Sequence, residues 1–96
     1  MKIRRSAAAR DDLERIYRYF AGLNPYAAKR IIIEIDQKFS MLADNPRLGR
    51  ERPEFGIGAR SFVSRNYVIL YRISEAELMI LRVLDGRMDI EAQLDK

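Results

Sequence analysis

The chain has 96 residues, of which 48% are hydrophobic and 33% charged, with a net charge of +4. These values exclude a disordered chain and are typical of a single small domain spanning residues 1–96. No apolar run approaches the roughly 18 residues of a membrane helix, the N-terminus lacks the pattern of a secretory signal, and there is no cysteine. We therefore expect a cytoplasmic protein with neither disulfides nor a membrane partner.

A short strand over Lys2–Arg5 is expected first, and an amphipathic helix follows it. Ser6 suits the N-cap of this helix because its side-chain oxygen can accept a backbone N–H. Early acidic residues favour the positive end of the helix dipole, and they are Asp11, Asp12 and Glu14. Spacings of three and four define the apolar stripe, which contains Ala9, Leu13, Ile16, Tyr17, Phe20 and Leu23.

A second helix begins at Asn24-Pro25, where Asn is a good N-cap and Pro suits the first helical position. It is expected to stop at Asp44, before Asn45-Pro46. Its apolar stripe contains Ala28, Ile31 or Ile32, Ile35, Phe39 and Leu42. The two helices therefore form an antiparallel hairpin.

Three strands are predicted after an irregular Pro- and Gly-containing loop over residues 46–58. They cover residues 60–65, 67–73 and 78–84, and short turns make them antiparallel neighbours. The predicted fold class is α+β, with an N-terminal strand and a helical hairpin packed on one face of a mainly antiparallel sheet. An even turn between the last two strands would put Arg72 and Arg82 on opposite faces, and an odd turn would put them together. The sequence leaves this register open.

The last two strands carry apolar residues on both faces, whereas the helical hairpin covers only one face. The uncovered face would expose several of a set of five residues, Val68, Leu70, Met79, Leu81 and Val83. Leaving three or four such side chains in water forgoes several kcal/mol. Either the loop or the tail over residues 90–96 folds back over this face, or a protein partner covers it; we expect the partner, another copy of the chain being one candidate.

Positive charge is concentrated between Arg47 and Arg72, where six arginines oppose only Glu51 and Glu54. Arginine binds carboxylates and phosphates through a planar fork of donors. The segment is either a solvated surface or a site for an acidic partner, and we expect the partner, a nucleic acid or an acidic protein segment.

Covalent chemistry has few candidates, because the sequence contains neither histidine nor cysteine. This excludes Ser-His-Asp and Cys-His nucleophile systems and zinc sites of the usual composition. Asp85, Asp89 and Glu91 lack the spacing of a calcium loop. We predict no metal site, no cofactor and no catalytic residue. Acid–base work would fall to Arg, Tyr and Lys, whose ordinary pKa values are about 10 or higher.

The order of motifs resembles the ParE-type toxins of the RelE/ParE superfamily, over nearly the whole chain. The motifs that carry this resemblance are NPRLGRERPE at 45–54, GARSF at 58–62, NYVILYR at 66–72 and ILRVLDGRMD at 80–89. The resemblance implies the toxin of a type II toxin–antitoxin module. It also implies a ParD-like antitoxin whose C-terminal segment lies along the toxin, DNA gyrase as the target, and no sequence-specific DNA binding by the toxin itself.

Two sets of residues are candidates for these interactions. We assign target binding to the arginines of the sheet and its loops, namely Arg60, Arg65, Arg72, Arg82 and Arg87. The antitoxin is expected to contact the second sheet face and the outer surface of the helical hairpin. Tyr17 and Tyr26 are further candidates for this contact, the alternative being that tyrosines at helical spacing belong to the core or its rim. The sheet residues of this site are Val68, Leu70, Met79, Leu81, Val83 and Arg72.

One position departs from the family pattern: many relatives have His where this chain has Asp85. We expect Asp85 to form an ion pair with Arg82 or Arg87 instead. The alternative function is that of a RelE-type endoribonuclease that cuts mRNA on the ribosome, whose basic positions Arg60 and Arg82 match loosely. The Tyr or His that such enzymes carry near the C-terminal strand is missing after Leu84. A third hypothesis is a member that binds partners but has lost toxicity.

Overall fold

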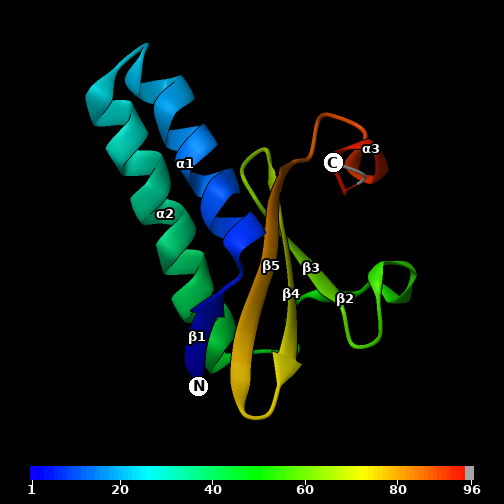
Figure 1. Ribbon diagram of the computed structural model, residues 1–96. Coiled ribbons are helices and arrows are strands. Elements are labelled where there is room, and N and C mark those ends of the chain that lie inside the picture. Colours follow the sequence, from blue (N-terminus) through cyan, green and yellow to red (C-terminus); the bar gives the residue numbers. More distant parts are fainter. Residues whose placement is uncertain (95–96) are drawn as a thin grey trace.

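The fold is given by a computed structural model that describes residues 1–94. Figure 1 shows a helical hairpin, a curved sheet and a short C-terminal helix. The elements are β1 (Lys2–Arg5), α1 (Ala7–Ala21), α2 (Pro25–Asp44), β2 (Arg50–Glu51), the 3₁₀ helix η1 (Pro53–Phe55), β3 (Arg60–Ser64), β4 (Tyr67–Ser74), β5 (Glu77–Asp85) and α3 (Ile90–Leu94).

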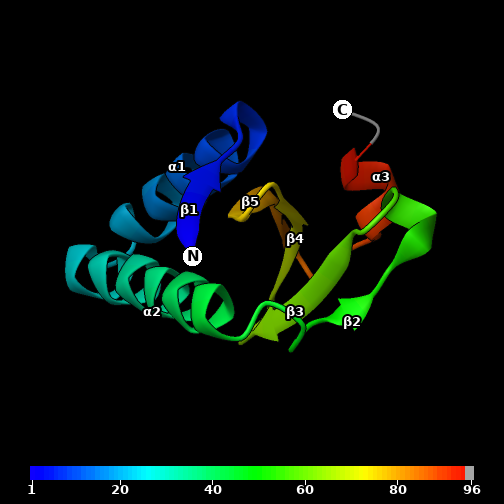
Figure 2. The same cartoon turned by 90° about the horizontal axis from the view of Figure 1, so that it is seen from below.

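The sheet has the strand order β1-β5-β4-β3-β2, so that the first strand of the chain lies beside the last. β1 runs parallel to β5, and each of the other neighbours is antiparallel. Seen from below, α1 and α2 lie on one side of the sheet while α3 lies on the other (Figure 2). The predicted α+β class and the order of strand, hairpin and meander are confirmed.

Both helices of the hairpin begin at the predicted caps. The Ser6 side chain accepts a hydrogen bond from the Ala9 N–H at 3.0 Å, and the Asn24 side chain accepts one from the Tyr26 N–H, also at 3.0 Å. Pro25 occupies the first turn of α2, where its missing N–H leaves no bond unmade. Within residues 1–94 no helix is both long and apolar enough to cross a membrane.

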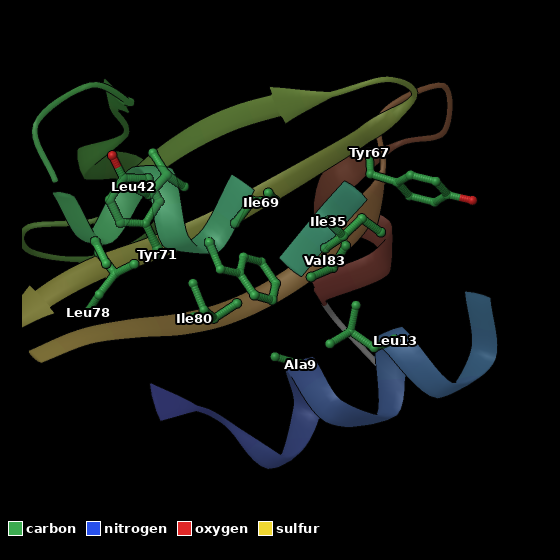
Figure 3. Packing of buried hydrophobic residues seen from close by; sticks show 12 residues of the cluster. Ala9, Leu13, Ile35, Leu42, Tyr67, Ile69, Tyr71, Leu78, Ile80 and Val83 are labelled. Carbon is green, nitrogen blue, oxygen red and sulfur yellow. The ribbon is translucent and has the colours of Figure 1, made fainter. Parts of the chain in front are cut away.

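The main core lies between the helical hairpin and the sheet (Figure 3). The buried residues of this core are Ala9, Leu13, Ile35, Phe39, Leu42, Ala43, Tyr67, Ile69, Tyr71, Leu78, Ile80 and Val83. Burying each of the larger apolar side chains among them contributes about 1.5–3 kcal/mol to folding. Tyr17 and Leu23 were predicted on the inner stripe but are exposed, and Leu23 lies beyond Ala21, the last residue of α1.

A β-bulge in β5 settles the register that the sequence left open. The β4–β5 turn contains two residues, Glu75 and Ala76, both with positive φ (50° and 64°), as in the type I′ turns of tight hairpins. An even turn alone would separate Arg72 and Arg82, but the register shifts at Leu70, which pairs with Arg82. The extra residue puts Arg82 on the face that Leu70 and Arg72 share, and it turns Val83 towards the helices.

The second face of the sheet is covered by the chain itself. Val68 is 7% exposed and Leu70 is 2% exposed, because Phe55 of η1 and the apolar side of α3 lie over them. The residues packed on this smaller cluster are Phe55, Leu81, Ile90 and Leu94. Our expectation of an open face awaiting a partner was therefore wrong, and the alternative of a folded-back loop and tail is correct. Residues 95 and 96 of that tail lie outside the described residues.

Candidate functional site

Arg60 holds the loop that follows α2, together with the buried hydroxyl of Tyr71. The Tyr71 hydroxyl donates to the Pro46 carbonyl and accepts from the Gly49 N–H, both at 2.8 Å. The Arg60 guanidinium donates to the Gly49 carbonyl at 2.8 Å and to that of Arg47. A Cβ on Gly49 would lie 2.4 Å from the Tyr71 oxygen, so only glycine fits there. Burial raises the pKa of Tyr71.

A buried ion pair ties α1 to β5 and contains Arg82. The Asp12 carboxylate is fully buried and accepts from the Arg82 Nε at 2.7 Å, from its terminal nitrogen at 3.0 Å and from the Val83 N–H at 2.9 Å. The hydrogen bond to Asp12 raises the pKa of Arg82. Arg82 therefore joins two elements instead of pointing into solvent. Asp12 was predicted only to favour the helix dipole; the sequence signal for its burial was its position beside Leu13 on the inner stripe.

Side chains close the edge of β5 beyond the point where β1 ends. The Ser6 hydroxyl donates to the Leu81 carbonyl at 2.8 Å. Farther along, the Gln93 side chain of α3 accepts from the Asp85 N–H and donates to the Asp85 carbonyl, both at 2.9 Å. One amide thus replaces the backbone of a neighbouring strand and fixes α3 to the sheet.

Asp85 forms the predicted ion pair, and its partner is Arg87. The Asp85 carboxylate accepts from the Arg87 backbone N–H at 2.9 Å and from its guanidinium at 3.1 Å and 3.2 Å. The side-chain hydrogen bond from Arg87, followed by the backbone bond, lowers the pKa of Asp85 and in turn raises that of Arg87. Gly86 lies close to the β3–β4 turn, and its backbone N–H donates to the Asn66 carbonyl at 2.6 Å.

Arg65 lies at the same end of the sheet and pairs with α2. Its guanidinium binds both oxygens of Glu34, which lowers the pKa of Glu34 and raises that of Arg65. Between Arg65 and Arg87, Tyr67 is mostly buried, and burial, followed by the charge of Asp85, raises its pKa. This end therefore presents two exposed arginines, each bound to a carboxylate.

The predicted target-binding arginines do not form one surface. Arg65 and Arg87 are exposed at the end of the sheet where β3 turns into β4. Arg60 lies near the opposite end of the sheet, where it is the β-ladder partner of Tyr71. Arg72 follows Tyr71 in β4, and it is exposed and forms no ion pair within residues 1–94. Arg82 lies between these groups and is 16% exposed.

The predicted antitoxin residues differ in exposure. Val68, Leu70 and Val83 are buried, and Val83 belongs to the opposite face. Met79 and Leu81 are half-buried. The outer hairpin is far more open: Tyr26 is 82% exposed. Its exposed apolar residues are Tyr17, Tyr19, Leu23, Tyr26 and Ile33, of which only Tyr17 and Tyr26 were named as candidates for the antitoxin contact. No group of three or more acidic residues that could hold a metal ion occurs in the described part of the chain.

Solved structures with the same fold define the class of protein. A chain of the chromosomal ParDE toxin–antitoxin system from P. aeruginosa superposes with a TM-score of 0.75 at 25% identity, covering 88% of this chain and 95% of that one. A chain of the toxin–antitoxin complex RelBE2 from Mycobacterium tuberculosis does so with a TM-score of 0.65 at 28% identity and the same coverage. The architecture is thus that of the RelE/ParE toxins.

Sequence comparison identifies the family within this class. The profile of the family described as ParE toxin of type II toxin–antitoxin system, parDE, matches residues 3–90. Toxin ParE3 of Caulobacter vibrioides is 35% identical over 96 residues, which is 99% of this chain and 96% of the relative. Toxin ParE1 of Mycobacterium tuberculosis is 31% identical over 68 residues, covering 70% of this chain and 69% of the relative. The chain belongs to the ParE toxin family of type II toxin–antitoxin systems.

Proposed function

We propose that this toxin inhibits DNA gyrase by binding it, without breaking covalent bonds, and that a ParD-like antitoxin neutralises the toxin in the cytoplasm. Membership of the ParE family supports the module, and the neighbouring ParDE and RelBE2 structures are toxin–antitoxin systems. Binding is the reading that the available side chains favour, because the sequence has no His or Cys.

The observation that supports a binding mechanism is that Arg82 is held in an ion pair with Asp12. In a ribonuclease of the RelE type, Arg82 is one of the two basic positions that match loosely, and its guanidinium would have to be free to reach RNA. Here its guanidinium is occupied by the buried Asp12 carboxylate at 2.7 Å and 3.0 Å. Releasing Arg82 would remove two of the four hydrogen bonds to the buried Asp12 carboxylate, which costs several kcal/mol. The exposed Arg65, Arg72 and Arg87 are better placed to contact a macromolecule.

Contact with the antitoxin is proposed at the outer hairpin and at Arg72, which need no rearrangement. The exposed aromatic rings of Tyr17 and Tyr26 offer large contact areas of the kind that dominate protein interfaces. Val68 and Leu70 would become accessible only if η1 and α3 moved. Met79 and Leu81 are already half-buried, whereas Val83 lies in the core under the helices and would stay buried.

The test compares gyrase and RNA directly. Purified toxin is expected to block supercoiling by gyrase and to leave cleaved DNA, while transcripts in a translating extract stay intact. Replacing both Arg65 and Arg87 by Ala removes two exposed cations and is expected to weaken inhibition about tenfold. The matched control replaces Lys29 and Arg30, exposed on α2, and is expected to change little.

Two other outcomes separate the alternatives. Cleavage of ribosome-bound mRNA, abolished by Arg82→Ala, would contradict the proposal in favour of the endoribonuclease. Normal growth of cells that express the toxin without antitoxin, together with undisturbed gyrase, would instead indicate a member that has lost toxicity.

A further inference from the structure

The loop that connects α2 to β2, residues 45–49, is held by its backbone. Figure 2 shows it leaving the end of α2 and reaching β2 at the edge of the sheet. The fully buried Tyr71 binds the Pro46 carbonyl and the Gly49 N–H, and the Arg60 guanidinium binds the carbonyls of Gly49 at 2.8 Å and Arg47 at 3.3 Å. These bonds fix the loop without using the side chains of Arg47 and Leu48.

A shallow hollow of about 440 Å³ lies on this loop. Its lining consists of Asn45, Pro46, Arg47 and Leu48 and is mostly apolar. Leu48 is 53% exposed although it is apolar. The volume falls in the range of binding sites, about 300–1,000 Å³. The hollow therefore offers a partner a preformed apolar surface, whose ordering cost has been met in folding.

Arg47 supplies the positive charge of the hollow. Its side chain is exposed and forms no ion pair within the described residues. Three arginines that follow it in the chain each have a carboxylate partner, namely Arg52, Arg60 and Arg65. A guanidinium binds a carboxylate or a phosphate through its planar fork of donors. The hollow thus combines apolar surface with one unused group that can bind an anion.

The surroundings of the hollow favour a protein segment over the other partners. Asp44 and Glu51, on either side of the loop in sequence, are both exposed, so the phosphates of a nucleic acid would meet two carboxylates and leave the apolar lining in water. A second copy related by a two-fold axis would bring Arg47 towards Arg47. A protein segment with an apolar side chain beside a carboxylate satisfies both Leu48 and Arg47.

The hollow is also far from the surface assigned to the antitoxin. Tyr17 and Tyr26 lie near the closed tip of the hairpin, where α2 begins, whereas the hollow follows the end of α2. The helix has 20 residues, which corresponds to about 30 Å. The target is therefore the partner that this surface fits.

We propose that the hollow at residues 45–48 binds a protein segment of the target, DNA gyrase. In this contact an apolar side chain packs on Pro46 and Leu48, and a neighbouring carboxylate pairs with Arg47. The inference rests on the proposed function only in naming gyrase as the protein that carries the segment. Neither Arg47 nor Leu48 was among the predicted target-binding residues.

The contact is tested first by inhibition of gyrase supercoiling in the absence of antitoxin. Leu48→Asp and Arg47→Glu, each alone, should weaken inhibition about tenfold. The matched controls Leu23→Asp and Arg30→Glu make the same changes at exposed positions of the hairpin and should inhibit like the natural chain. Circular dichroism checks that all four variants fold. Full inhibition by Leu48→Asp, or equal losses in Leu23→Asp and Leu48→Asp, would overturn the proposal.

A second test locates the contact without gyrase. A blocked peptide, Gly-Leu-Leu-Asp-Asp-Gly, is titrated into isotope-labelled toxin to about 5 mM, a range that detects weak binding. We expect the amide resonances of Arg47, Leu48 and Gly49 to shift most, and a peptide with Ser in place of Leu to shift them much less.

Three results of this titration would overturn the proposal: no shift, shifts that lie only elsewhere, or stronger shifts of the same amides with a thymidine oligonucleotide. If the natural toxin does not inhibit gyrase, the proposed function fails, whereas the titration still decides whether the hollow binds such a segment. The two proposals therefore fail separately.

Discussion

Asp12 and Arg82 are seventy positions apart in the chain, yet they form its most buried charged contact. Two guanidinium nitrogens and the Val83 N–H surround the carboxylate, and Arg15 adds a third cationic donor at 3.2 Å. A buried carboxylate is tolerated only when its oxygens are satisfied in this way. The pair therefore fixes where α1 crosses β5.

Removing the carboxylate tests this role. We expect Asp12→Ala to lower the free energy of unfolding by about 3 kcal/mol, because Arg82 and the Val83 N–H lose their partner. Urea unfolding followed by circular dichroism measures the change. The control Asp11→Ala, on the exposed side of α1, should stay within about 0.5 kcal/mol. The double variant Asp12→Leu, Arg82→Met should recover much of the lost free energy of unfolding. Equal decreases for Asp11→Ala and Asp12→Ala would contradict the role assigned to Asp12.

Asp85 makes stability depend on pH. Hydrogen bonds from Arg87 lower its pKa in the folded chain below the ordinary value of 3.8. The unfolded chain then takes up a proton before the folded chain does, so this contribution is present above that value and is lost as the pH falls through the folded pKa. We expect the stability difference between the natural chain and Asp85→Asn to shrink below about pH 4. Urea unfolding across this range measures it.

The control for Asp85 is Asp44→Asn, since Asp44 is exposed and makes no ion pair in residues 1–94. Its stability difference from the natural chain should stay nearly constant with pH. A constant difference for Asp85→Asn as well would show that the contact with Arg87 does not survive in solution.

Among the elements, the hairpin helices and the three long strands could be predicted because their signals are local. Apolar spacing, the caps at Ser6 and Asn24, and the runs of β-branched residues act within a few positions. β2 has two residues and α3 has five, too few to show a period. The bulge opposite Leu70 has no signal of its own, and it alone moved Val83 to the other face.

The site was less predictable than the fold because its partners are distant in sequence. Arg82 and Arg65 looked like free cations in their strands, but their carboxylates come from α1 and α2. Only the pairing of Asp85 with Arg87 was local enough to be foreseen, and the sequence left its partner open between Arg82 and Arg87.

Gln93 links α3 to the edge of β5, and its removal should loosen that link alone. We expect Gln93→Ala to speed hydrogen exchange at the Asp85 amide about tenfold, because that N–H loses its acceptor. Exchange at the centre of β4 should not change. The exposed neighbour Glu91 provides the control variant Glu91→Ala. Unchanged exchange at Asp85 would mean that Gln93 does not occupy this edge in solution.

For the whole molecule, the important correction is that the chain covers both faces of its own sheet. The isolated protein is expected to bind little of an apolar dye such as anilinonaphthalene sulfonate. The double variant Ile90→Asp, Leu94→Asp should strongly increase dye fluorescence, because Val68, Leu70 and Leu84 lose their cover. Ile57→Asp, at a residue that is 96% exposed, is the matched control. Strong dye binding by the natural chain would restore the open-face interpretation.

The parallel contact of β1 with β5 has a consequence for synthesis on the ribosome. Lys2 pairs with Glu77 and Arg5 pairs with Ile80, so the first strand to emerge must wait for nearly the whole chain before it finds its neighbour. Contacts this far apart in sequence make folding slow. The hairpin helices emerge long before the sheet that buries their apolar stripes. We therefore expect the sheet of the nascent chain to stay incomplete until β5 has been synthesised, so that every surface built on this sheet forms only near the end of translation.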